Sequence, residues 1–224
     1  MQVGTHAIQS ESPTGRKVVL RALSKAELLR DYAALRLTAL RDELGWAHSS
    51  PQTPDDVIDD YDSRALPYGV FDQGDLAGAI RLVWGDSIDM IPSASFIKRI
   101  STSQGTSAEL SRAVVSPRYR RCGVFSALIA VCVHTARAAA ISRVFVSIVD
   151  SRKGRELFSR EGFRAIGEPF HYTDRTVAVS QPAILLSADF DSDNFNERTS
   201  LDRIAFLLET AALAIRRRHD VQPI

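Results

Sequence analysis

The sequence predicts one α/β domain in which helices cover a sheet of mixed strand direction. Three observations lead to this prediction. Segments of strand composition alternate with helical ones along most of the chain, without an internal repeat. The turn at 72–75 joins two strand-like segments as an antiparallel hairpin. The apolar stretch Arg143–Val149 does not alternate, which is typical of a strand buried on both faces. Pattern alone allows several folds of this kind.

Composition and turn residues place the individual elements. Strands are expected over 17–23, 68–71, 76–84, 109–115, 143–149, 163–166 and 177–188, and helices over 24–44, 124–140, 153–161 and 201–218. Ser24 and Glu27 form an S-x-x-E capping box, which opens the first helix. The Ser/Thr-rich stretch 93–107 is expected to be a mobile loop, and the polar stretch 47–63 to be irregular.

The chain divides into three expected parts. Residues 1–15 are rich in Ser, Thr, Gly and Gln and are expected to form a disordered N-terminal arm. Residues 16–190 form the domain, and residues 191–224 form a C-terminal helical extension. The apolar side chains of this extension fall on one helical face, so the helix must pack on its own sheet or on a second copy of the chain. Its own sheet is the preferred site.

The composition excludes several classes of function. The formal net charge is +1, so no global charge draws the chain to nucleic acid or to a membrane surface. Residues 1–17 lack the apolar core of a secretory signal, and no apolar run is long enough to span a bilayer. Cys122 and Cys132 form no C-x-x-C pair and are expected to be reduced core residues. The histidines show no ligand spacing, so we expect no metal site. Since the sequence shows no signal, no membrane span and only unpaired cysteines, we expect a reduced, cytoplasmic protein.

The segment 116–125, Ser-Pro-Arg-Tyr-Arg-Arg-Cys-Gly-Val-Phe, places a basic turn between a strand and the start of a helix. Free backbone N–H groups and the helix dipole at such a start make a site suited to phosphate. Gly123 allows the backbone to approach a ligand closely. A solvated basic turn is the alternative interpretation. The candidate phosphate ligands are Arg118, Arg120, Arg121, Gly123 and Val124.

The strand segment Glu109-Leu110-Ser111-Arg112 carries a candidate general base. Acyl transfer to an amine requires removal of a proton, a thioester held nearby and donors for the developing oxyanion. Glu109 is suited to accept the proton, directly or through water. In a regular strand Glu109 and Arg112 point to opposite faces, so a β-bulge is needed to bring both into one cleft. Such a bulge also frees a backbone N–H near 113–115 for the thioester oxygen.

These two segments carry a family resemblance. The basic loop is similar to the acyl-donor loop R/Q-x-x-G-x-G/A of the GNAT acyltransferase superfamily, with Arg120 and Gly123 at matching positions. Over residues 35–115, the order and spacing of several residues resemble the acyl-homoserine-lactone (autoinducer) synthases of that superfamily. The residues at characteristic positions are Arg36, Trp46, Asp59, Asp62, Arg81, Phe96, Glu109 and Arg112.

The resemblance implies both a fold and an activity. The fold is a single GNAT-like three-layer domain, with a mixed, mostly antiparallel sheet flanked by helices. The activity is transfer of an acyl group from acyl carrier protein or acyl-CoA to the amine of S-adenosylmethionine, which makes a signalling lactone for quorum sensing. Glu109 and Arg112 are then catalytic, and the other characteristic residues bind the amine substrate. No cofactor is expected to stay bound, and the enzyme is expected to be a monomer or a homodimer.

Side-chain chemistry leaves part of this assignment open. Asp59 and Asp62 would attract or orient a cationic substrate such as S-adenosylmethionine, and Trp46 offers a stacking face for it. A structural tie of the two aspartates to Arg36 or Arg81 is equally expected. Plain core packing is equally expected for Trp46.

Three positions depart from the family patterns. Phe125 replaces a small residue and would crowd the pyrophosphate of coenzyme A, which favours a carrier-protein donor. Leu40 and Ala113 each replace an aromatic residue in the expected amine pocket, which predicts a roomier pocket with relaxed or shifted selectivity. The alternatives are an N-acyl amino acid synthase, which the Tyr-Arg-Arg loop at 119–121 favours, an acetyl-CoA-dependent acetyltransferase, and a non-catalytic acyl-binding domain.

Overall fold

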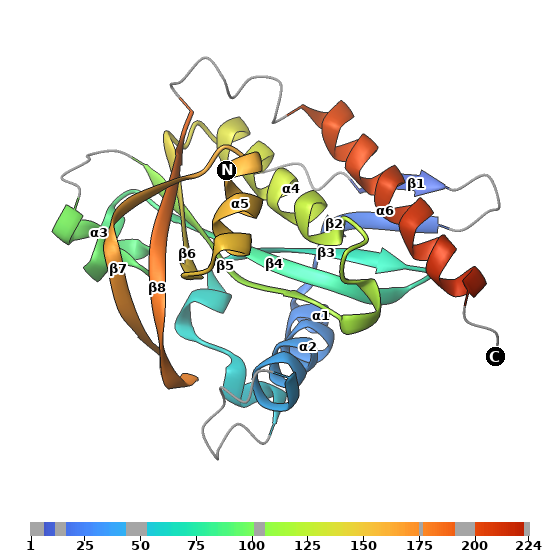
Figure 1. The fold of residues 1–224 in the computed structure, drawn as a ribbon, viewed down its shortest axis with the longest axis horizontal. Coiled ribbons are helices and arrows are strands. Elements are labelled where there is room, and N and C mark those ends of the chain that lie inside the picture. Colours follow the sequence, from blue (N-terminus) through green and yellow to red (C-terminus); the bar gives the residue numbers. More distant parts are fainter. Residues whose placement is uncertain are drawn as a thin grey trace.

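An eight-stranded sheet forms the centre of the computed structural model, with the strand order β1-β2-β3-β4-β5-β6-β8-β7 (Figure 1). The structure describes residues 7–11, 17–43, 53–100, 106–174, 177–190 and 200–221. Neighbouring strands are antiparallel except β5 and β6, which are parallel. The expected mixed, mostly antiparallel sheet is confirmed.

The expected strands and helices occur in the expected order, but the strand expected over 163–166 is longer and runs to Asp174. The strands are β1 (Ile8–Glu11), β2 (Lys17–Ala22), β3 (Leu66–Asp72), β4 (Asp75–Gly85), β5 (Ser107–Val115), β6 (Arg143–Val149), β7 (Arg164–Asp174) and β8 (Val177–Asp189). The later helices are α3 (Ala94–Ile100), α4 (Val124–Ala138), α5 (Arg152–Arg160) and α6 (Leu201–Val221). Short 3-10 turns are η3 (Pro54–Val57), η4 (Asp60–Ser63), η5 (Ile88–Met90) and η6 (Pro117–Tyr119).

The first helical segment alternates between α and π geometry. Its parts are α1 (Lys25–Glu27), η1 (Leu28–Tyr32), α2 (Ala33–Thr38) and η2 (Ala39–Glu43). The expected capping box opens it, because the Ser24 hydroxyl accepts from the Glu27 N–H and the Glu27 carboxylate accepts from the Ser24 N–H. The segment buries Tyr32 and Arg36 on the side that faces the sheet.

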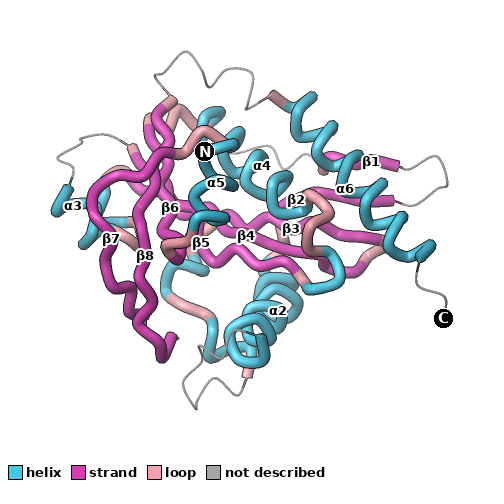
Figure 2. Tube along the Cα trace, viewed as in Figure 1, coloured by secondary structure: helices cyan, strands magenta, loops and turns pink. Residues whose placement is uncertain are grey.

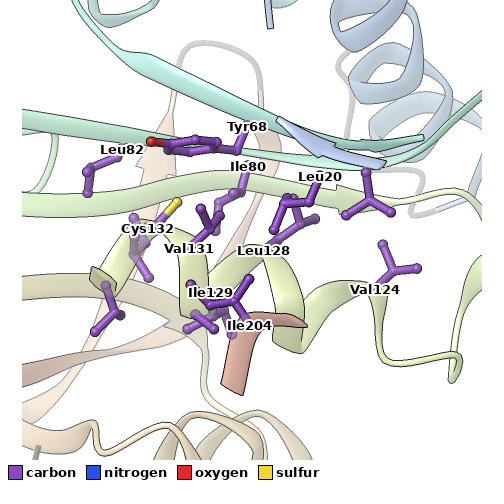
Figure 3. Packing of buried hydrophobic residues seen from close by; sticks show 14 of the residues in the cluster. Leu20, Tyr68, Ile80, Leu82, Val124, Leu128, Ile129, Val131, Cys132 and Ile204 are labelled. Carbon is purple, nitrogen blue, oxygen red and sulfur yellow. The ribbon is translucent and has the colours of Figure 1, made fainter. Parts of the chain in front are cut away.

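Helices cover both faces of the sheet, as Figure 2 shows. On one face α4 packs on β3, β4 and β5, and α6 packs on α4, β1 and β2. The apolar side of α4 buries Leu128 and Cys132 among Leu20, Ile80 and Leu82 of the strands (Figure 3). On the other face η1 and α2 lie against β4 and β5. The strands that carry the candidate site therefore lie between two helical layers.

The parallel strands β5 and β6 pair over a short stretch only. Ser107–Leu110 of β5 lies in register with 143–146 of β6. β5 then continues along β4, while β6 continues along β8. The two strands part after Leu110 and Val146, which opens the middle of the sheet at that point.

The N-terminal arm differs in part from the expectation of disorder over residues 1–15. Ile8–Glu11 forms the edge strand β1, in antiparallel register with 17–20 of β2. An uncovered edge strand presents unpaired N–H and C=O groups, and here α6 packs on β1 as well as on β2. Composition did not reveal this strand, because the segment is short and partly polar and is held by β2 and by α6, a helix from the far end of the sequence.

The stretch 93–107 is not a loop throughout, because α3 occupies its first part. Ile97 of α3 is fully buried together with Ile91 and Phe145. The serines and threonines of this stretch carry no information about that contact. Tertiary packing of an apolar side chain therefore overrides the local preference for a loop.

The C-terminal helix α6 packs on its own domain. Ile204, Leu208 and Ala211 are buried in the same core as α4 and the strands. Both cysteines, Cys122 and Cys132, also lie buried in this core. None of the helices in the described ranges combines the length and the apolar character needed to cross a membrane.

Candidate functional site

A cavity of about 450 Å³ lies where β5 leaves β6 and approaches the start of α4. Its apolar wall is made by Ala113, Val114, Val115, Phe125 and Leu157. Its basic end is made by Arg120 and Arg121, next to Gly123. A cavity that is apolar along a strand and basic at a helix start suits a chain-like ligand that carries phosphate.

The helix start at this cavity leaves backbone donors without an acceptor in the helix. Gly123 is the N-cap of α4 and has a φ of 86°, which lies in the left-handed region that glycine adopts without strain. The hydrogen bond from Ala127 N–H to the Gly123 carbonyl closes the first turn. The N–H groups of 124–126 therefore have no intrahelical acceptor, and together with the helix dipole they favour an anion.

Two of the five expected phosphate ligands do not direct their side chains to the cavity. Arg118 forms an ion pair with Asp75, the first residue of β4, at 2.7 Å. The side chain of Val124 is buried in the core, so only its backbone N–H is available to a ligand. The other three, two arginines and the glycine, line the cavity.

The β-bulge that the proposed chemistry requires is present in β5. Its register against β4 shifts so that two residues of β5, Arg112 and Ala113, stand opposite one residue of β4. Arg112 has a φ of 54°, an uncommon value for a residue other than glycine. The Tyr32 hydroxyl donates to the Arg112 carbonyl at 2.6 Å and so holds the bulge from the helical layer. The bulge places Ala113 on the cavity wall.

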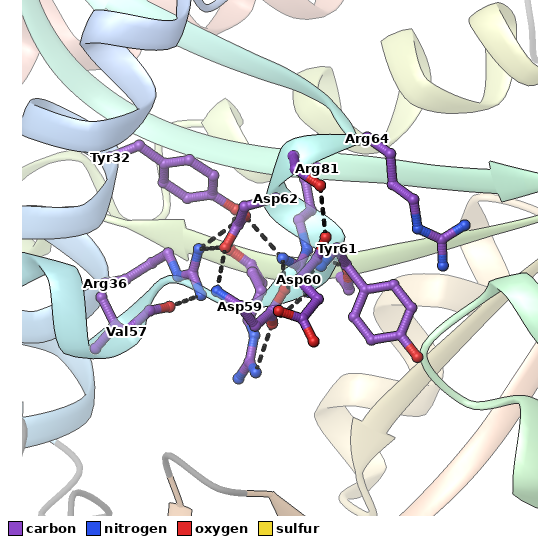
Figure 4. A network of polar contacts seen from close by, with 12 residues as sticks. Tyr32, Arg36, Val57, Asp59, Asp60, Tyr61, Asp62, Arg64 and Arg81 are labelled. Carbon is purple, nitrogen blue, oxygen red and sulfur yellow. Dashed lines mark hydrogen bonds and ion pairs between the residues drawn. The ribbon is translucent and has the colours of Figure 1, made fainter.

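The two aspartates of the D-x-x-D segment lie in a network of ion pairs (Figure 4). Arg81 donates to the two oxygens of Asp59 at 2.6 and 2.8 Å, and lies 2.7 Å from Asp62. Arg36 donates to the two oxygens of Asp62 at 3.0 and 2.9 Å. Arg112 donates to Asp59 at 3.1 Å. Three guanidinium groups from α2, β4 and β5 therefore surround two carboxylates.

Asp59 and Asp62 also form the turn that holds them. Asp59 accepts from the Tyr61 N–H at 3.0 Å, and Asp62 accepts from the Asp59 N–H at 2.9 Å. Burial acts to raise the pKa of Asp59, but Arg81 and Arg112 outweigh it and hold that pKa below its usual range. The side chain of Asp62 is 1% exposed and that of Asp59 is 23% exposed. Both aspartates are tied to arginines, and only Asp59 is accessible to a ligand.

Glu109 lies on β5, the strand that also carries Arg112, and is only 2% exposed. One carboxylate oxygen accepts from the Ser93 N–H at 2.7 Å, and the other accepts from the Ser93 hydroxyl at 2.8 Å. Burial raises the pKa of Glu109 to about 7, although the Ser93 hydrogen bonds and the charges of Arg81 and Arg112 act to lower it. A carboxylate with this pKa is suited to accept a proton and to return it near neutral pH.

The remaining expected site residues lie in different places. Phe96 of α3 stacks on Phe170 of β7, with ring centroids 4.0 Å apart. Trp46 lies outside the described residues. Leu40 packs in a small apolar cluster with residues of α2 and η3, so of the two positions expected to widen the amine pocket only Ala113 borders the cavity. In the described ranges, no group of three or more His, Cys, Asp or Glu is placed to hold a metal ion.

Other residues of the site carry no signal in the sequence. Ala39 and Leu157 reach the cavity from η2 and α5. Ser93 and Ser147 connect to Glu109 through their hydroxyl groups. Alanine, leucine and serine are common everywhere in a protein, and these four belong to no motif of fixed spacing. Only the folded chain brings them to the site.

Comparison with known proteins relates this geometry to a family. The family model for the acetyltransferase (GNAT) family matches residues 34–163, more than half of the 224-residue chain. Among curated proteins, no match was found.

Solved structures share the fold over most of their length. FeeM, an N-acyl amino acid synthase from uncultured soil microbes, is 20% identical with a TM-score of 0.58, over 84% of this chain and 97% of that one. An N-acetyltransferase from Staphylococcus aureus Mu50 is 16% identical with a TM-score of 0.57, over 77% and 98%. A GNAT family acetyltransferase from Elizabethkingia anophelis with acetyl-CoA bound is 14% identical with a TM-score of 0.51, over 77% and 98%. At these identities the likeness is one of fold.

Proposed function

The chain belongs to the acetyltransferase (GNAT) family and is an acyltransferase, and from this premise we propose that it joins the acyl group of a thioester to the amine of an α-amino acid. The network of ion pairs is the observation that favours an amino acid over S-adenosylmethionine as the acceptor. Asp59 and Asp62 already face three arginines, so the network has no surplus negative charge for a cationic sulfonium. The side chain of Arg112 is 14% exposed, and a guanidinium in this position favours a carboxylate.

The donor half of the proposal rests on the cavity. The phosphate of a phosphopantetheine arm meets Arg120, Arg121 and the start of α4, and the arm follows 113–115 of β5 toward the opening between β5 and β6. The ring of Phe125 lines this cavity and packs edge-to-face on Phe158, with centroids 5.8 Å apart. A ring at that position leaves less room for a pyrophosphate than a small residue would, which supports acyl carrier protein over coenzyme A as the donor.

The chemistry needs one base and one oxyanion site. The amine nitrogen attacks the thioester carbon, so a C–N bond forms while the proton of the amine passes to Glu109. The oxyanion that develops faces the backbone of the β5 bulge, where Arg112 and Ala113 have left the regular ladder. The C–S bond then breaks, and the thiolate leaves as the thiol after it recovers a proton.

The test is a product analysis with defined donors and acceptors. Purified protein is incubated with acyl-CoA and acyl carrier protein thioesters of several chain lengths, and with either twenty free amino acids or labelled S-adenosylmethionine. N-acyl amino acids as the products support the proposal. An acyl-homoserine lactone formed only from S-adenosylmethionine replaces it with the synthase activity that the spacing from Arg36 to Arg112 suggests. Acetylation from acetyl-CoA alone, or no product at all, refutes both.

Glu109→Gln tests the base in the same assay. We expect kcat to fall by roughly 10²- to 10⁴-fold with the fold retained, because glutamine keeps the shape but accepts no proton. Glu168→Gln is the matched control, since Glu168 is exposed on β7. Full turnover by a folded Glu109→Gln variant removes Glu109 from the mechanism.

A further inference from the structure

Glu109 is nearly sealed from solvent, so the proposed base does not meet an incoming amine directly. The backbone N–H and the hydroxyl of Ser93 cover its two carboxylate oxygens. Ser93 itself is 1% exposed. A proton from the acceptor amine must therefore reach Glu109 through Ser93 and through a group that connects Ser93 to the solvent side.

A second serine provides the bridge. The Ser147 hydroxyl lies 2.6 Å from the Ser93 hydroxyl, which lies 2.8 Å from Glu109 Oε1. Three side chains from β6, from the η5–α3 connection and from β5 therefore form one continuous chain of hydrogen bonds. Within the described residues, the Ser147 hydroxyl has no polar partner other than Ser93.

Ser147, the outer end of these linked hydrogen bonds, lies where β5 and β6 part. Ser147 directly follows Val146, the last residue of β6 that pairs with β5. Unlike Ser93 and Glu109, Ser147 is partly exposed. The strands part at this residue, and the cavity for the donor begins on the neighbouring strand beyond the same point.

The charge of Glu109 sets the direction of the two hydrogen bonds that link Glu109, Ser93 and Ser147. When Glu109 is ionised, the single proton of the Ser93 hydroxyl points to the carboxylate, so Ser147 must donate to Ser93. The lone pairs of Ser147 then face the opening and accept from an N–H group. When Glu109 is protonated, its O–H donates to Ser93 and the Ser93 hydroxyl donates to Ser147. The Ser147 hydroxyl then directs its proton to the opening between β5 and β6.

We propose that Ser147 and Ser93 form a proton relay, in which Ser147 contacts the acceptor amine and passes its proton through Ser93 to Glu109. This inference rests on the proposed function. As the C–N bond forms, the amine proton goes to Ser147, the Ser147 proton to Ser93, and the Ser93 proton to Glu109. As the C–S bond breaks, the same three transfers run in reverse and deliver the proton to the leaving thiolate. The number of protons and the charge are unchanged over the cycle.

Ser147→Val and Ser147→Thr form a matched pair, because the two side chains have almost the same shape and differ in the hydroxyl. Valine also leaves less space than alanine for a water that could replace the hydroxyl. We expect Ser147→Val to lower kcat by roughly 10²-fold, and Ser147→Thr to stay within about threefold of the natural chain. Ser187→Ala, a buried serine on the neighbouring strand β8, serves as the control for loss of a hydroxyl in this sheet.

Two further measurements separate a relay from a structural role. An NMR titration of Glu109 should give the same pKa in Ser147→Val as in the natural chain, since Ser93 still donates to the carboxylate, and since Arg81 and Arg112, the charged groups that act on Glu109, are unchanged. The KM for the acyl donor should also be unchanged. The kcat of the natural chain should show a solvent isotope effect with more than one proton in flight, and that of Ser147→Val should not.

The outcomes distinguish the relay from the function on which it rests. Full kcat in Ser147→Val, with kcat lost in Glu109→Gln, overturns the relay and keeps the acyltransfer proposal. Equal losses in the valine and threonine variants overturn the relay as well, because shape and not the hydroxyl would then matter. Full kcat in Glu109→Gln overturns the base and the relay together.

Discussion

The two halves of the candidate site are built in opposite ways. The phosphate end of the donor half is a contiguous segment, 116–126, that offers backbone N–H groups, one glycine and exposed arginines. The acceptor half joins four separate elements, and its charged groups are largely buried against one another. Changes in the donor half are therefore expected to act one by one on binding, whereas loss of one member of the acceptor half leaves other charges unpaired and acts on stability.

The largest effect is expected for Asp62→Ala, which breaks the acceptor half. Arg36 and Arg81 would keep their buried charges without this partner, and such losses cost about 3–5 kcal/mol of unfolding free energy. Urea unfolding measures the change. Asp60→Ala, an exposed neighbour in the same turn, should stay within about 0.5 kcal/mol. Equal stability of the two variants would show that Asp62 does not stabilise the buried charges of Arg36 and Arg81.

The second effect is a dependence of stability on pH. The pKa of Glu109 is raised from 4.5 to about 7, so the folded chain holds this proton more tightly than the unfolded chain. The stabilisation is complete below pH 4.5 and is lost as the pH rises through 7, which amounts to up to about 3 kcal/mol. Urea unfolding at pH 4 and pH 8 should show this loss in the natural chain but not in Glu109→Gln. Parallel pH profiles of the two proteins would contradict the burial of a titrating carboxyl.

A third comparison separates backbone strain from donor binding. Gly123 and Gly74 both have left-handed φ values, 86° at the helix start and 96° in the β3–β4 turn. Alanine at either position should cost about 1–2 kcal/mol of stability. Only Gly123→Ala should also weaken binding of an acyl-phosphopantetheine thioester in calorimetry, because Gly74 is not among the residues that line the cavity. Weaker binding in both variants would mean that the effect reports stability alone.

The smallest effects are expected among the arginines of the donor half. Alanine at both Arg120 and Arg121 should raise the Kd of an acyl-phosphopantetheine thioester about tenfold and reduce its dependence on salt. Arg118→Ala should leave that Kd unchanged, because Arg118 pairs with Asp75 in an exposed ion pair that contributes at most about 1 kcal/mol. A larger effect of Arg118→Ala on Kd would place this side chain at the phosphate.

The same contrast explains which parts of the site were predictable. The strand, glycine and helix start of 116–125 act through local backbone geometry, so a short segment was enough to predict a donor site there, and Arg120, Arg121 and Gly123 do line a cavity. The need for a bulge followed from the spacing of Glu109 and Arg112, because regular strand geometry places them on opposite faces. The partners of Asp59, Asp62 and Arg118 depend on elements far away in the chain, and the sequence left the first two open and assigned the third to the phosphate.

Periodicity, turns and a capping box by themselves determined the order of strands and helices, the hairpin and the start of the first helix, because each depends on neighbouring residues. They also predicted which segment could offer an anion site. Tertiary structure alone decided that residues 8–11 form an edge strand, that α3 exists, and that the strands part after Leu110. It also decided that Ser93 meets Glu109 and that Ser147 meets Ser93, because hydrogen bonds between separate elements depend on packing and leave no local pattern.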